Sequence, residues 1–140
     1  MRIVIDTNVF IAALRSSTGA SHALLQLIYR RKLAPLLSVP LMMEFEEVAK
    51  RPGMLPHLST GEIEVALNMV ANRGIEQKIY FSWRPFLPDP DDDMLVELAI
   101  AGRARHIVTG NLRDLSPARS LGLLVMTPAE FLRDFQKSPP

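Results

Sequence analysis

Four aspartates crowd into the stretch DPDDD, residues 89–93, directly before an apolar helical pattern. One aspartate at the start of a helix is ordinary, because its side chain caps a backbone amide and its charge suits the positive end of the helix dipole. We expect Asp89 and Asp91, which flank Pro90, to lie in a solvated turn, and Asp91 or Asp92 to cap the helix. Capping does not account for all four, so at least one carboxylate is left for chemistry.

Other acidic and amide side chains follow predicted strands at the point where each strand ends. Asp6 ends the β-branched run RIVI, residues 2–5, and both Asn111 and Asp114 follow the run HIVT. In parallel sheets the carboxyl ends of the strands share one rim, and ligands bind there. A helix that follows a strand begins on the same rim, so the aspartate-rich helix start is expected nearby.

Glu44 lies on a predicted helix whose apolar stripe includes Leu41 and Ala49. At about 100° per residue, Glu44 falls at the margin of this stripe, whereas Glu46 and Glu47 point elsewhere. A carboxylate against an apolar face is costly unless it is paired or binds a cation. Glu44 is therefore a candidate site residue. The alternative is that Glu44 lies at the edge of the stripe and is hydrogen-bonded to an arginine without any role in a site.

The free aspartate before the helix is either Asp92 or Asp93. Each continues an apolar face of that helix, so periodicity does not choose between them. Carboxylates gathered around one point repel each other unless a cation is present, and oxygen ligands favour Mg²⁺ or Mn²⁺. Such an ion suits the hydrolysis of a phosphodiester. No Ser-His or Cys-His pattern suggests a covalent route.

Strands and helices alternate along the chain. This order predicts an α/β fold with three α/β/α layers, a mainly parallel sheet and helices on both of its faces. We expect one domain over residues 1–136 and a disordered tail over 137–140. The expected strands are 2–5, 33–39, 76–83, 105–110 and 123–127; the expected helices are 8–14, 22–31, 40–50, 60–73, 92–101 and 128–135, with 111–122 irregular.

Composition excludes several classes of protein. The 140 residues contain no cysteine, and the three histidines have no metal-ligand spacing, so neither a disulfide framework nor a zinc site is expected. No apolar run approaches the length of a membrane span, and we expect a cytoplasmic protein. The net charge of +1 argues neither for nor against the binding of nucleic acid. However, 12 of the 16 basic residues are arginines, which suit phosphate contacts, and basic residues form clusters at 30–32, 50–51 and 103–105.

The order of these residues resembles a known family. The pieces are IDTNVF with Asp6, LLSVPLMMEFEEVAKRP with Glu44, DPDDDMLVELAIAGRARHIVTGN with Asp93, and NLRDL. Together they resemble the PIN-domain ribonucleases, in particular the small VapC-like toxins of toxin-antitoxin systems. The resemblance runs from Met1 to about Glu130 and rests on four blocks in order, since no single block is specific.

The resemblance implies an α/β/α fold, cleavage of RNA that depends on Mg²⁺ or Mn²⁺, a homodimer, and neutralisation by an antitoxin protein. It matches Asp6, Glu44 and Asp93 to the first three metal-site acids, and it prefers Asp93 to Asp92 by its spacing to Thr109. Asn8 and Thr109 match positions that orient the acids or a water.

The fourth acid departs from the pattern that the resemblance implies. Many relatives have an aspartate where this chain has Asn111, while VapC-like toxins often carry the amide there and an acid three residues later, as at Asp114. An amide binds a divalent ion less strongly than a carboxylate does. Either residue is expected to complete the site.

Two rival hypotheses remain at this point. One is a PIN fold that has lost catalysis and binds RNA or protein. The other is a phosphatase or receiver that is phosphorylated on an aspartate, which would also place Asp6 after the first strand. It is disfavoured because the DTN motif, residues 6–8, lacks a second acid and no lysine follows the run LLVMT.

Overall fold

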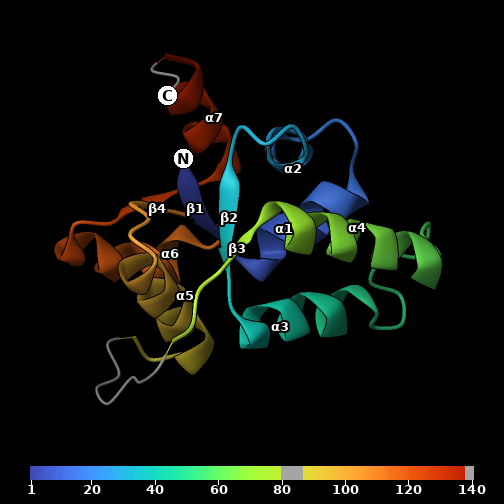
Figure 1. Cartoon of the computed structure of the whole chain (residues 1–140), viewed down its shortest axis with the longest axis horizontal. Coiled ribbons are helices and arrows are strands. Elements are labelled where there is room, and N and C mark those ends of the chain that lie inside the picture. Colours follow the sequence, from blue (N-terminus) through green and yellow to red (C-terminus); the bar gives the residue numbers. More distant parts are fainter. Residues whose placement is uncertain (80–86, 138–140) are drawn as a thin grey trace.

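A central sheet of five parallel strands organises the chain in the computed structural model, which describes residues 1–79 and 87–137. The strand order is β3-β2-β1-β4-β5, so β1 is in the centre and both of its neighbours run parallel to it (Figure 1). The strands are β1 (Arg2–Ile5), β2 (Ala34–Leu37), β3 (Ile75–Glu76), β4 (His106–Val108) and β5 (Leu124–Met126).

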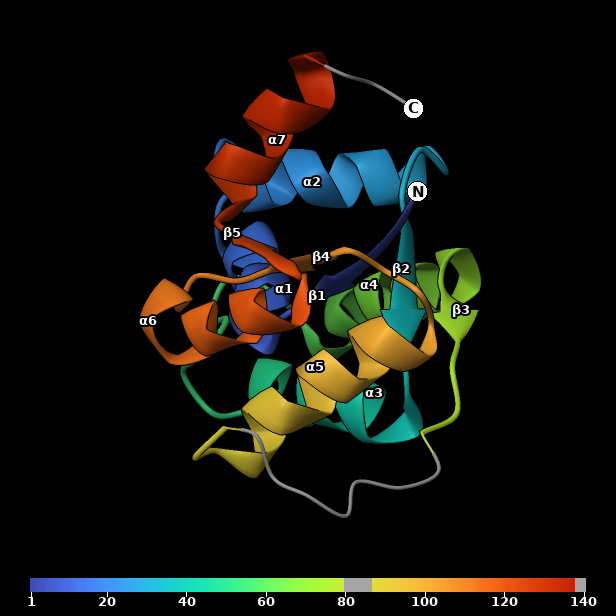
Figure 2. The ribbon, with the colours of Figure 1, turned by 90° about the vertical axis from the view of Figure 1, so that its left-hand side faces the viewer.

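Helices cover both faces of the sheet. Four of them, α1 to α4, lie on one face, whereas α5 and α6 lie on the other, as the turned view in Figure 2 shows. The helices are α1 (Thr7–Arg15), α2 (Ala20–Tyr29), α3 (Val39–Ala49), α4 (Thr60–Arg73), α5 (Pro90–Ala101), α6 (Leu112–Leu115) and α7 (Pro128–Lys137), with a 3₁₀ helix at Ser116–Leu121. The predicted three-layer α/β/α architecture is therefore confirmed.

Local sequence explains where the main elements begin and end. The three β-branched residues of β1 are at most 1% exposed, as expected of a central strand covered on both faces. Helix α4 begins with a capping box, in which the side chains of Ser59 and Glu62 each accept the other residue's backbone N–H, and it ends before Gly74.

The aspartate-rich helix begins earlier than predicted. Asp89, and not Asp91 or Asp92, is the N-cap of α5, and its carboxylate accepts a hydrogen bond from the N–H of Asp91 at 2.9 Å. Proline at the first helical position is the reason, because its fixed φ suits a helix start and it has no amide to leave unpaired. The turn predicted around Pro90 is thus the first turn of α5.

Three further boundaries differ from prediction. The third strand is short, at Ile75–Glu76, and residues 80–83 of its predicted range lie outside the described residues. The segment predicted to be irregular contains α6 and the 3₁₀ helix. Lys137 belongs to α7 instead of a tail, and 138–140 lie outside the described residues. No helix in the described part of the chain is long and apolar enough to cross a membrane.

Candidate active site

Asp6 stands at the carboxyl end of the central strand, where its carboxylate is held by three donors. It is the N-cap of α1, so Oδ1 accepts the N–H of Thr7 at 2.7 Å. Oδ2 accepts the hydroxyl of Thr109 at 2.8 Å and the side-chain amide of Asn8 at 3.3 Å. The N–H of Asp6 donates to the carbonyl of Val108, so the residue is fixed between β1 and β4.

Asn8 and Thr109 also hold the loop after β4 against the start of α1. The side-chain oxygen of Asn8 accepts the N–H of Gly110 at 2.9 Å, and the fully buried hydroxyl of Thr109 accepts the N–H of Asn111 at 2.9 Å. Both residues also donate to Asp6, and the sequence resemblance matches them to positions that orient the acids or a water.

An open cleft of about 400 Å³ lies beside Asp6. Five carboxylates line it, together with a single basic side chain among the described lining residues. The lining residues are Asp6, Thr7, Asn8, Ile11, Arg15, Glu44, Val48, Met54, Asp89, Asp91, Asp92 and Asn111. The structure thus brings Asp6 and Asn111 to one cleft, as their places at the strand ends predicted, together with Asp92 from the helix start and Glu44 from α3.

Three carboxyls of this cleft have a raised pKa. Burial raises the pKa of Asp6, although its three hydrogen bonds act in the opposite direction. Burial also raises the pKa of Glu44, and the negative charges of Asp91 and Asp6 add to the effect. For Asp92, burial and then the charge of Asp6 raise the pKa to about 6. A cation in the cleft would remove this penalty.

Asp93 does not line the cleft. Its side chain is only 6% exposed, and its Oδ1 accepts the N–H of Leu87 at 2.6 Å. One step along a helix rotates a side chain by about 100°, which turns Asp93 into the interior and leaves Asp92 on the rim. The resemblance preferred Asp93 by its spacing to Thr109, whereas the residue that lines the cleft is Asp92.

Asn111 and Asp114 bond each other at the start of α6. The amide of Asn111 donates to the carboxylate of Asp114 at 2.8 Å, and its side-chain oxygen accepts the N–H of Asp114 at 3.4 Å. Both groups of the Asn111 side chain are therefore engaged. Asp114 does not line the cleft, but its charge contributes to the raised pKa of Asp92, so it lies close to the rim.

The donor chemistry fits a hard divalent cation, although within the described residues no group of three or more acidic or histidine side chains is close enough to hold one. Mg²⁺ needs only one or two carboxylates, because it keeps several waters. The buried hydroxyl of Thr7 faces Glu44 and lowers the pKa of that carboxyl, although burial outweighs this effect.

Sequence reasoning missed Arg15, Thr7 and the part played by Asp89 and Asp91. Arg15 lies on the α1 face that also carries Asn8 and Ile11, so helical spacing from Asp6 could have found it. Asp89 and Asp91 were expected to lie in a solvated turn, with Asp91 one of two candidates for the helix cap, yet both line the cleft and raise the pKa of Glu44.

Residues 2–113 match the family model of the PIN domain. The chain belongs to the PIN domain family. This membership leaves the phosphatase or receiver hypothesis without support, and it agrees with the expected fold. All of the acids discussed above lie in the matched region except Asp114, which follows it directly.

Two comparisons place this PIN domain among known proteins. It is 26% identical over 157 residues to an uncharacterized protein from Methanocaldococcus jannaschii, covering 98% of this chain and 93% of the relative. It is also similar in fold to a chain in the crystal structure of VapBC2 from Rickettsia felis bound to a DNA fragment from their promoter. That match has a TM-score of 0.60 and 16% identity, and it covers 89% of this chain and 97% of the other.

Proposed function

We propose that this PIN domain is an endoribonuclease that depends on Mg²⁺ or Mn²⁺ and hydrolyses RNA phosphodiesters. The observation that supports it best is the acidic cleft, where Asp6, Glu44 and Asp92 come from three different elements and have raised pKa values. Burial and mutual repulsion of these carboxyls destabilise the fold, and a bound divalent cation would offset this cost.

Each residue has a distinct role in this proposal. Asp6 and Asp92 would hold the ion from β1 and α5, with Glu44 on the facing helix and Asp114 at the rim. Bound there, a divalent ion supplies a Lewis acid and lowers the pKa of water. Asn111 orients Asp114 through their mutual hydrogen bonds, as Thr109 orients Asp6. Asp93 is a structural residue in this scheme.

Arg15 would hold the RNA backbone beside these acids. It is exposed, it lines the cleft, and its guanidinium donates to the backbone oxygen and the sulfur of Met54, at 3.4 and 3.1 Å. A guanidinium suits a phosphate because its N–H groups can bind two oxygens at once. It would offset the repulsion between the carboxylates and the phosphates of the substrate.

We further propose that the protein is the toxin of a toxin-antitoxin pair. The likeness in fold to a chain of VapBC2 supports this, as does the sequence resemblance to VapC-like toxins. Its partners would be RNA, an antitoxin protein and a second copy of the chain in a homodimer. A nuclease of this kind acts on cellular RNA in the cytoplasm and needs no membrane.

Incubation of the protein with a mixed RNA pool, with and without Mn²⁺, followed by mapping of the new RNA ends tests the proposal. We expect new ends only with Mn²⁺, and we expect Asp6→Asn and Asp92→Asn to abolish them. Asp134→Asn, on the exposed side of α7, is the matched control and should cleave like the wild type. Cleavage of equal extent in all four proteins would show that a contaminant or another site is responsible.

A PIN fold that binds RNA or protein without cleaving it is the second candidate. The observation that favours it is that the described residues contain no group of three acids close enough to hold an ion. Calorimetric titration with Mn²⁺ separates the two. Binding that is lost in Asp92→Asn supports the nuclease, whereas no binding at millimolar Mn²⁺ together with uncut RNA supports the binding module.

A further inference from the structure

Two turns at the amino end of the sheet share a strained backbone. Arg31 and Arg103, with φ of 61° and 60°, are the non-glycine residues with positive φ in the parts of the chain that the structure describes. The first follows α2 and the second follows α5. Glycine adopts this left-handed conformation without a steric penalty, whereas a side chain does not.

Both turns are Schellman motifs. In the first, the N–H of Lys32 donates to the carbonyl of Leu27 at 2.9 Å, and the N–H of Arg31 donates to that of Ile28 at 3.0 Å. The turn after α5 repeats these two bonds, at 2.8 and 3.3 Å. The left-handed position of this motif is usually glycine, yet an arginine occupies it in both turns. Backbone strain that is retained at two equivalent positions indicates that the two arginine side chains have a function.

The two turns lead into β2 and β4, which are the two neighbours of β1. With adjacent strands about 4.8 Å apart, the starts of β2 and β4 lie on the order of 10 Å apart. Six cations lie in these turns or next to the first residues of the strands, and we call them the basic edge: Arg2, Arg30, Arg31, Lys32, Arg103 and Arg105. All six are exposed, and none forms an ion pair within the described residues.

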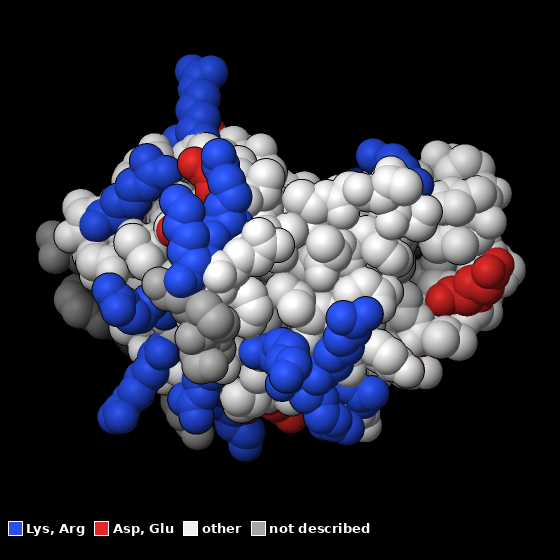
Figure 3. All heavy atoms as spheres, turned by 90° about the horizontal axis from the view of Figure 1, so that it is seen from above, with Lys and Arg blue, Asp and Glu red and all other residues white. Residues whose placement is uncertain are grey.

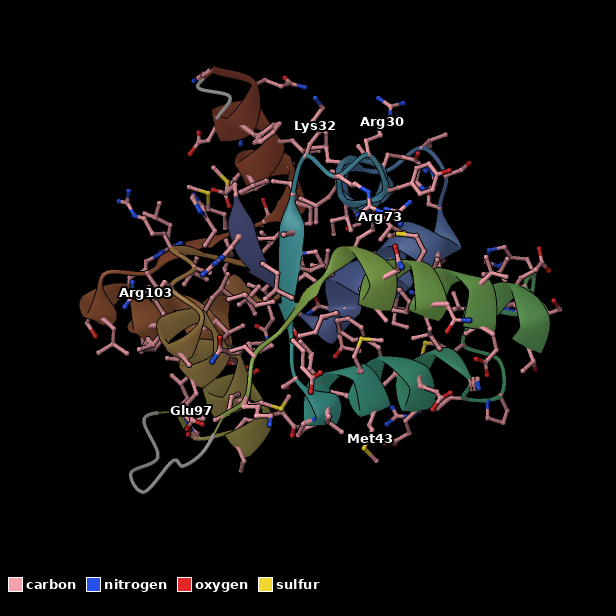
Figure 4. The ribbon with its side chains drawn as sticks, in the orientation of Figure 1. Arg30, Lys32, Met43, Arg73, Glu97 and Arg103 are labelled. Carbon is pink, nitrogen blue, oxygen red and sulfur yellow. The ribbon has the colours of Figure 1, made fainter. Side chains whose placement is uncertain are left out.

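The charges of the molecule are therefore separated along the direction of the strands. Because the sheet is parallel, all strands begin at the end of the sheet that carries the basic edge and run toward the end that carries the acidic cleft. Figure 3, seen from above, shows lysine and arginine side chains spread over this face with few acids among them. Figure 4 shows Arg30 and Lys32 projecting from the end of α2, on the side away from Met43 and α3.

An aromatic ring stands next to these cations. Tyr29, the last residue of α2, is 54% exposed. Arg73 lies over its ring, with the guanidinium carbon 5.2 Å from the ring centroid, and donates through Nε to its carbonyl at 2.9 Å. The ring is thus held in place while much of it faces solvent. Cations that follow a backbone, combined with an aromatic ring on which a base can stack, are typical of sites for single-stranded nucleic acid.

We propose that the basic edge binds the phosphate backbone of single-stranded nucleic acid, with Tyr29 as a stacking platform for one base. Arginine favours phosphate because its planar fork binds two oxygens. The exposed ring beside the cations suits a nucleobase, which can stack on it while the arginines bind the phosphates. This site lies at the opposite end of the sheet from the acidic cleft. It needs neither metal nor cleavage, so it goes beyond the proposed function.

The double variant Arg31→Gly/Arg103→Gly tests the site without endangering the fold. Glycine suits both left-handed positions, so the melting temperature should stay the same or rise while two cations are lost. Binding of a labelled single-stranded RNA is measured by fluorescence anisotropy in EDTA over a series of salt concentrations. We expect affinity to fall about tenfold, and the slope of log K against log salt to fall by about 1.4, or about 0.7 for each lost phosphate contact.

A matched control removes two cations elsewhere. Lys50→Ala/Arg51→Ala lowers the net charge by the same amount, but these side chains already pair with Glu46, Glu64 and Glu47. Its affinity and slope should equal those of the wild type. Tyr29→Ala should weaken binding without changing the slope, because stacking involves no charge, and Tyr29→Phe should keep the wild-type affinity.

Two results would overturn the proposal. The first is an Arg31→Gly/Arg103→Gly variant that binds RNA with the affinity and slope of the control. The second is tight binding of polyglutamate with no binding of RNA, which would identify a surface for acidic proteins instead. Because the titrations contain EDTA, an inactive acidic cleft would not affect them, so failure of the nuclease proposal remains distinguishable.

Discussion

Asp92 and Asp93 are neighbours with opposite environments. Asp92 lines the cleft and its pKa is raised to about 6, whereas Asp93 is buried and binds the N–H of Leu87. We predict that Asp93→Ala lowers the free energy of unfolding by about 1–3 kcal/mol, because a buried amide loses its acceptor. Asp92→Ala should instead stabilise the protein in EDTA and reduce metal-dependent cleavage by more than about 100-fold.

Thermal melting in EDTA and RNA cleavage in Mn²⁺ measure the two effects separately. The assignment fails if Asp92→Ala melts lower than the wild type in EDTA while its cleavage is unchanged. It also fails if Asp93→Ala loses cleavage at a temperature at which its fold is intact, because Asp93 would then act in the cleft.

The raised pKa of Asp92 predicts an unusual dependence of stability on pH. Its pKa in the folded protein is about 6, against an ordinary value of 3.8, so between these values the folded state holds a proton that the unfolded state has lost. The free energy of unfolding therefore falls as pH rises through this window. We expect the melting temperature in EDTA to increase on acidification from neutral pH toward pH 5. Asp92→Asn, which cannot ionise, should flatten that increase.

The hydrogen bond from Asn111 to Asp114 predicts how the substitution Asn111→Asp affects stability and metal binding. In Asn111→Asp, a carboxylate replaces the amide that donates to Asp114 at 2.8 Å, so two negative charges face each other. The variant should melt lower in EDTA and bind Mn²⁺ more tightly than the wild type, with higher cleavage activity, because the ion relieves the added repulsion. Calorimetry with Mn²⁺ measures the affinity, and an unchanged value would place residue 111 outside the metal shell.

At the level of elements, α5 sets the position of Asp92 through its packing on the sheet. Gly102 ends this helix, and a Cβ added there would lie 2.3 Å from Cδ1 of Leu36, which is fully buried in β2. Gly102→Ala should therefore lower the free energy of unfolding by about 1–3 kcal/mol and reduce cleavage, as overpacking shifts α5. Denaturant unfolding measures the first effect.

Gly61→Ala is the matched control for this packing. It lies in the first turn of α4, where a Cβ would meet only Oγ of Ser59 at 3.8 Å. Alanine is the better helix former, so this variant should be as stable as the wild type or slightly more stable. An equal loss of stability in both variants would mean that the helix ends, and not the contact with Leu36, explain the effect.

Most of the fold could be predicted from the sequence because its signals are local. The β-branched run of β1 and the capping box at Ser59 each carry their own evidence, and both are in the structure. The start of α5 was also predictable, since proline is favoured at the first position of a helix and Pro90 occupies it. What could not be predicted was α6, because four residues of helix carry no periodicity.

The candidate site was predictable in outline for a different reason. Parallel strands end at one rim, so Asp6 and Asn111 had to lie near each other. The choice between Asp92 and Asp93 depended on the rotation of α5 against the sheet, which both apolar faces of that helix left undecided. It is set by packing such as that of Gly102 on Leu36, between residues 66 positions apart in the chain. Contacts of that kind are invisible to periodicity.

On the scale of the whole molecule, the cleft joins segments that are distant in sequence. Its acids come from the end of β1, from α3 and from the start of α5, so the site exists only in the folded chain. A ligand that binds only the folded state stabilises it by mass action. The unfolded chain has the same carboxylates but cannot bring them together, so it binds a divalent ion weakly.

We therefore predict that Mn²⁺ raises the melting temperature, with a gain of about 2.7 kcal/mol in the free energy of unfolding at a concentration near 100 times the dissociation constant. Asp92→Asn should melt above the wild type in EDTA, because it relieves repulsion with Asp6, and it should lose most of the gain from Mn²⁺. Asp134→Asn, on the exposed side of α7, should keep the full gain. An equal gain in all three proteins would mean that Mn²⁺ acts outside the cleft, and the acids would then be a cost to the fold that metal does not relieve.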